Sequence, residues 1–117
     1  MNVVDNFQRL GFSDPRAREA DRLSWEAEQA LKSNDMVKAR ELYGRAAEIE
    51  EAIALNAYDE PIRVRSILAV NAATLWYKAD EWDRVQRLVC PLLSEPDQFT
   101  DDARAELQDL LDQVIRR

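Results

Sequence analysis

The sequence predicts an all-α fold of about five main helices, arranged as two antiparallel helical hairpins and a C-terminal closing helix. Helix-favouring residues are abundant, whereas the 117 residues include only 2 Gly and 4 Pro. Apolar residues recur at helical spacing, and capping residues or prolines separate the periodic segments. We expect a lead-in at residues 1–12 and a single helical domain at residues 13–117.

The first hairpin is predicted to begin at Ser13 or Asp14, which caps a helix running to about residue 33. Asp35 is expected to cap the second helix, which ends near residue 57. The buried stripe predicted for the first helix consists of Ala20, Leu23, Ala27, Ala30 and Leu31. The inner face predicted for the second helix consists of Val37, Ala39, Leu42, Tyr43, Ala46, Ile49 and Ile53.

The second hairpin is predicted to begin at Pro61, with a helix over about 61–79 that is apolar almost all round. Such a helix belongs in the middle of a domain. Asp80 is expected to cap a fourth helix, with Asp83 in the position of a capping-box acid. Pro91 is expected either to bend that helix or to end it.

A final helix is predicted to begin after Thr100, its capping residue. Asp101 and Asp102 would lie at its positive end, where acidic residues are favourable. The stripe that faces inward consists of Ala103, Leu107, Leu110, Leu111 and Val114.

Charge and hydropathy argue against two classes of partner. A net charge of −7 without a run of basic residues is unfavourable for binding nucleic acid. The longest apolar stretch, between Ile67 and Tyr77, is too short to span a membrane. The N-terminus does not resemble a secretory signal, and the single Cys90 fits a reducing compartment, so we expect a cytoplasmic protein.

The composition also argues against catalysis. The chain has no histidine, which removes the usual general base and the commonest metal ligand, and its two glycines cannot form a phosphate loop. We interpret the acidic run Glu48, Glu50 and Glu51 as a solvated helix face, and Cys90 as a small buried hydrophobe. We therefore expect no enzyme, no metal site and no cofactor.

The first hairpin resembles a tetratricopeptide repeat, a motif of about 34 residues in which small residues face each other across two helices. The matching residues are Ala27, Asn34, Ala39, Tyr43 and Ala46. A looser match in the second hairpin consists of Ala73, Trp82, Val85, Val89 and Leu92. Ala39 and Val85 are 46 positions apart, so the unit is longer than a standard repeat. The resemblance implies a fragment of a right-handed α-α superhelix that binds proteins.

The chain also resembles short bacterial TPR-like proteins without an assigned activity. This second resemblance lies in Pro61, Arg63 and Arg65, in the segment 67–70, and in the segment 75–79. Together the two resemblances cover residues 20–115, and they imply a bacterial source and an adaptor role.

In this family the first helix of each hairpin lines a concave surface that binds a protein or peptide partner. From the first hairpin the surface would carry Asp21, Ser24, Glu28, Leu31 and Lys32. From the second hairpin the candidate partner-binding residues are Arg63, Arg65, Val70, Asn71, Thr74, Tyr77 and Lys78. A floor of Val70 and Tyr77 with a rim of Arg63, Asn71 and Lys78 would suit an acidic or carboxylate-ended peptide.

Two alternatives remain open from the sequence. In the first, Val70 and Tyr77 pack on the closing helix, and the arginines pair with nearby carboxylates. In the second, the chain is a small structural or regulatory subunit that forms a homodimer, because two hairpins are few for a self-sufficient repeat array. The apolar groups expected at such an interface are Phe7, Phe12, Trp25 and the segment 91–93.

Overall fold

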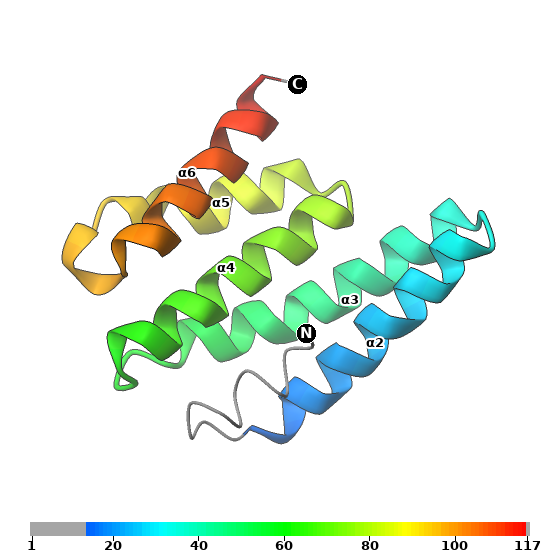
Figure 1. Cartoon of the computed structure of the whole chain (residues 1–117), viewed down its shortest axis with the longest axis horizontal. Coiled ribbons are helices and arrows are strands. Elements are labelled where there is room, and N and C mark those ends of the chain that lie inside the picture. Colours follow the sequence, from blue (N-terminus) through cyan, green and yellow to red (C-terminus); the bar gives the residue numbers. More distant parts are fainter. Residues whose placement is uncertain (1–13, 117) are drawn as a thin grey trace.

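The computed structural model describes residues 14–116, and these form an all-α fold with five α-helices (Figure 1). The helices are α2 (Pro15–Lys32), α3 (Met36–Leu55), α4 (Ile62–Lys78), α5 (Trp82–Leu93) and α6 (Asp101–Ile115), with a short 3₁₀ turn, η1 (Pro96–Gln98), before the last helix. The predicted fold class is confirmed. The expected lead-in at residues 1–12 lies outside the described residues.

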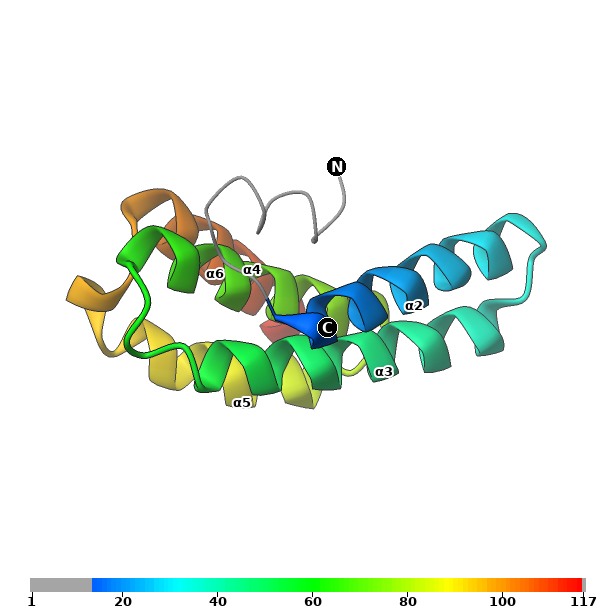
Figure 2. The ribbon, with the colours of Figure 1, turned by 90° about the horizontal axis from the view of Figure 1, so that it is seen from below.

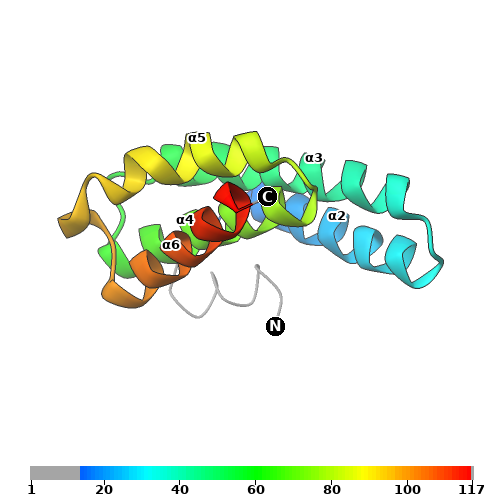
Figure 3. The same ribbon diagram turned by 90° about the horizontal axis from the view of Figure 1, so that it is seen from above.

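The helices form two layers. Helices α2, α4 and α6 lie in one layer, and α3 and α5 lie in the other (Figures 2 and 3). Two antiparallel hairpins, α2–α3 and α4–α5, stack side by side, and α6 packs against both α4 and α5. Helix α4 contacts α3, α5 and α6, which confirms the central position predicted from its apolar sequence.

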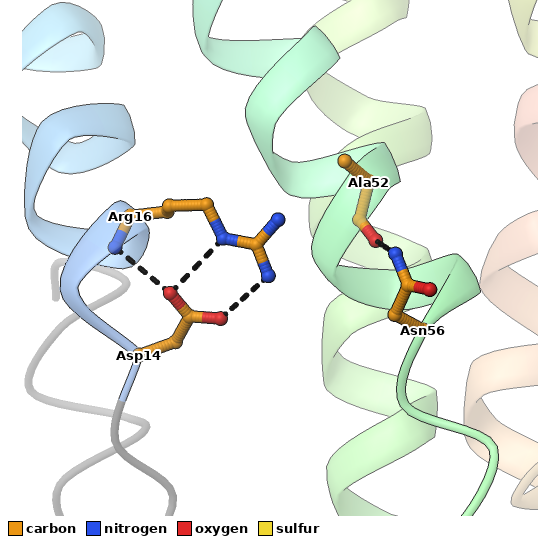
Figure 4. Close-up of polar contacts among 4 residues, drawn as sticks. All are labelled: Asp14, Arg16, Ala52 and Asn56. Carbon is orange, nitrogen blue, oxygen red and sulfur yellow. Dashed lines mark hydrogen bonds and ion pairs between the residues drawn. The ribbon is translucent and has the colours of Figure 1, made fainter.

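Local capping residues fix where several helices begin. The Asp14 carboxylate accepts a hydrogen bond from the Arg16 amide at 2.9 Å and pairs with the Arg16 guanidinium at 2.8 Å (Figure 4). Asp35 and Thr100 cap α3 and α6 as predicted, because their side chains accept from the amides three residues on. At the end of α3, the Asn56 side-chain amide donates to the Ala52 carbonyl at 2.7 Å (Figure 4).

Both hairpin corners use the same backbone motif. Asn34 and Asp80 have positive φ angles of 60° and 59°, and each follows the C-cap of the first helix of its hairpin. At each corner two backbone hydrogen bonds close the helix end in a Schellman motif, such as Glu81 N to the Trp76 carbonyl at 3.0 Å. The two corners are 46 positions apart in the sequence, the same separation as between Ala39 and Val85.

The expectation that Asp80 caps α5 is therefore wrong. Asp80 terminates α4 in the left-handed conformation, a role that Asp and Asn tolerate better than most residues. The N-cap of α5 is Glu81, whose side chain makes no capping hydrogen bond, so Asp83 is not part of a capping box. Pro91 lies inside α5, which ends two residues later at Leu93.

The core is rich in alanine where α2 and α3 meet. Ala27, Ala46 and Ala47 are fully buried, so the two helices approach closely and Tyr43 and Leu23 fill the remaining space. A second cluster at the other end of α3 consists of Ala17, Ile53, Ala57, Val64 and Leu68.

Three side chains lie outside the core against expectation. Leu31 is 37% exposed and Val37 is 75% exposed, because the tip of the α2–α3 hairpin extends past the α4–α5 corner (Figure 1). Cys90 is also exposed. It directly follows the buried stripe of Val85, Leu88 and Val89, and one further step around α5 turns it toward solvent.

Candidate partner-binding groove

A groove of about 450 Å³ lies between α4 and α6. Its lining residues come from the N-terminal half of α4 and the first turns of α6: Arg63, Ser66, Ile67, Val70, Asn71, Thr100, Asp102, Ala103 and Glu106. The two helices lie side by side in one layer and run in the same direction (Figures 1 and 2).

A hydrogen bond across the groove fixes the position of α6 on α4. The buried Ser66 hydroxyl accepts from the Thr100 amide at 2.9 Å, while the Thr100 hydroxyl caps α6. One residue pair thereby sets where α6 begins and how the two parallel helices align. In this alignment Asp102 lies at about the level of Ile67 along the helix axis. Glu106 lies about one turn further, at about the level of Val70 and Asn71.

The floor of the groove is apolar with one unused hydrogen-bond donor. Ile67 and Val70 are half-buried, and Ala103 is buried. The Asn71 side-chain nitrogen is shielded from solvent and has no hydrogen-bond partner among residues 14–116. Leaving a buried donor unpaired costs roughly 1–3 kcal/mol.

The groove brings together three of the seven predicted partner-binding residues: Arg63, Val70 and Asn71. Thr74 and Tyr77 lie further along α4 and are half-buried, and Tyr77, like Val70, packs against the main core. The Lys78 ammonium lies 5.6 Å from the centre of the Tyr43 ring, in a cation–π contact away from the groove.

Arg65 faces a different part of the molecule. Its guanidinium donates to the Gln98 side-chain oxygen and lines a pocket of about 200 Å³ with residues of α3, α5 and η1. The sequence also allowed an arrangement in which Arg63 and Arg65 pair with nearby carboxylates. Neither arginine forms an ion pair within the described residues.

The wall formed by α6 was not predicted as part of the site. The sequence predicts Thr100 as a helix cap, Asp102 as part of the first turn and Ala103 as core, and it assigns no role to Glu106. The alignment of α6 with α4 depends on a contact between residues 34 positions apart, which local pattern does not reveal. The residues expected from the first hairpin, such as Asp21 and Glu28, lie on α2 and do not line this groove.

Glu50 contradicts the interpretation of the acidic run as a solvated face. Its side chain is fully buried, and neither carboxyl oxygen has a hydrogen-bond partner within residues 14–116. It continues the stripe of Tyr43, Ala46 and Ile53 on α3, which helical spacing turns toward the core. Burial, with a smaller contribution from the negative charges of Asp14 and Asp21, raises the pKa of the Glu50 carboxyl to about 8.

No family model, curated protein or solved structure matches this chain. No helix in the part of the chain described by the structure is long and apolar enough to cross a membrane. Among the same residues, no group of three or more Cys, Asp or Glu side chains is arranged to hold a metal ion.

Proposed function

We propose that this chain is a non-catalytic protein-interaction module that binds a segment of a partner protein in the groove between α4 and α6. The observation that carries the proposal is the groove itself, with its apolar floor and charged side chains along both walls. Peptide-binding surfaces combine apolar contacts with a few polar groups that pair with the peptide backbone. The absence of histidine from the sequence also favours binding over acid–base catalysis.

The proposal extends to family and source. The two antiparallel hairpins, stacked side by side, support a TPR-like adaptor. By the resemblance to short TPR-like proteins, we place it in the bacterial cytoplasm.

Two matched variants test the proposal in a capture experiment from lysate of the source organism. Ile67→Glu puts a charge on the groove floor, and Ile115→Glu makes the same change at a position 60% exposed, outside the groove. A partner captured by the wild type and by Ile115→Glu, and lost by Ile67→Glu, would support the groove as the binding site. Equal capture by all three proteins would exclude it.

Loss of capture is informative only if the variant is folded, so circular dichroism melts accompany the experiment. Asn71→Leu serves as a second groove variant, since it preserves the side-chain volume and removes the unpaired donor.

A second candidate function is self-association. Large apolar side chains are exposed on the α2–α3 hairpin near its tip, namely Trp25, Leu31, Met36 and Val37. Exposed apolar groups that lie close together are typical of interfaces. Sedimentation equilibrium of the wild type and of Trp25→Lys separates the two functions, because only a homodimer that uses this tip would dissociate in the variant.

A further inference from the structure

The charges that line the groove are unevenly distributed. Asp102 and Glu106 project from α6 one turn apart, both are exposed, and no ion pair within the described residues neutralises either. Arg63 is the cation among the lining residues, and it lies on α4. The lining as a whole therefore carries an excess of negative charge, in line with the net charge of −7 of the chain.

The alignment of the helices separates these charges along the groove. Arg63 is eight residues before Asn71 on α4, which corresponds to about 12 Å of helix. The hydrogen bond between Thr100 and Ser66 sets the relative level of the two helices, so Glu106 lies at about the level of Asn71, at the end opposite Arg63. One end of the groove is consequently positive, and the other end carries the Glu106 carboxylate.

We infer that the partner segment is a short extended stretch in which a Lys or Arg stands next to an apolar side chain. This inference rests on the proposed function and specifies the chemistry of the segment. A groove of about 12 Å accommodates roughly four extended residues. The basic side chain pairs with Glu106 and Asp102, and the apolar side chain packs on Ile67 and Val70.

An acidic segment fits this groove less well. It would meet two carboxylates on α6, and Arg63 alone would attract it. Lys78, the other cation of the rim predicted to suit an acidic peptide, lies over the Tyr43 ring, and the nearby Arg65 donates to Gln98.

The test uses a random peptide library displayed on phage, selected against the full chain. The groove variant is Asp102→Asn with Glu106→Gln, which removes two charges and preserves side-chain shape. Its matched control is Asp101→Asn with Asp109→Asn, which removes two exposed charges from the same helix outside the groove. Enriched peptides are synthesised with a fluorophore, and their dissociation constants are measured by anisotropy at 50 and 300 mM NaCl.

We expect enriched peptides with Lys or Arg beside an apolar residue. Their binding should weaken about tenfold in the groove variant, change little in the control variant, and weaken with salt. Acidic or uncharged peptides that lose binding in Ile67→Glu but not in the groove variant would overturn the inference while supporting the groove. Peptides that bind all these variants equally, or no enrichment at all, would overturn both the inference and the proposed function.

Discussion

Replacing Glu50 by Gln should raise the stability of the protein at neutral pH. Glu50 is fully buried on α3, and neither carboxyl oxygen has a partner among residues 14–116. Gln has nearly the same shape and cannot ionise, so the variant removes the cost of keeping a proton on this carboxyl.

The size and sign of the effect follow from the pKa. In the unfolded chain the Glu50 carboxyl ionises near its ordinary pKa of 4.5, whereas in the folded protein its pKa is raised to about 8 by burial and by Asp14 and Asp21. Between these values the folded state binds one proton more than the unfolded state, so stability falls as the pH rises. The loss amounts to about 3 kcal/mol by pH 7 and levels off above pH 8, at 1.36 kcal/mol per pH unit.

The assay is urea unfolding followed by circular dichroism at pH 5, 6, 7, 8 and 9. The free energy of unfolding of the wild type should decline by about 3 kcal/mol more than that of Glu50→Gln between pH 5 and pH 8. Glu48→Gln, an exposed position on the same helix, serves as the control and should follow the wild-type profile. If the profiles of wild type and Glu50→Gln are parallel within about 0.5 kcal/mol, Glu50 does not hold its proton in the folded protein, and the argument fails.

Substitutions at three further positions test features of the fold, each by the same urea unfolding. Asn34→Val should cost roughly 1–2 kcal/mol, because a β-branched residue is strained at a φ of 60°, whereas Asn34→Gly should be neutral or stabilising. Thr100→Ala should cost about 1 kcal/mol through the lost cap of α6, and an unchanged midpoint would show that the cap contributes nothing. Ala27→Leu should cost roughly 1–3 kcal/mol by forcing α2 away from α3, and a more stable variant would indicate unfilled space at that interface.

The sequence was most informative where structure is set by local chemistry. Asp35 and Thr100 cap their helices through bonds to amides three residues away, so their roles could be read from neighbouring residues. The role of Asp80 does not follow from local sequence, because an aspartate at a helix corner suits either the start of one helix or the left-handed end of another. The backbone conformation of Asp80, with its positive φ angle, distinguishes the two roles, whereas the amino-acid composition of the corner does not.

The groove and Glu50 were harder to predict because both depend on distant contacts. The resemblance to a tetratricopeptide repeat pointed to Val70 and Asn71 on α4, but the opposite wall of the groove depends on the bond between Ser66 and Thr100. Glu50 looked solvated because it stands beside other acidic residues. Its burial follows from helical geometry, which turns it to the same side as Ile53, against the preference of a charged residue for water.

The position of α2 at the edge of the stack has a consequence for how the protein opens. Helix α2 packs almost entirely against α3, through alanines that bury little area each, whereas α4 is held by three other helices. Local opening of α2 therefore exposes less apolar surface than opening of α4. In native-state hydrogen exchange, amides of α2 should exchange through a partial unfolding of lower free energy, with α4 as the last helix to lose protection.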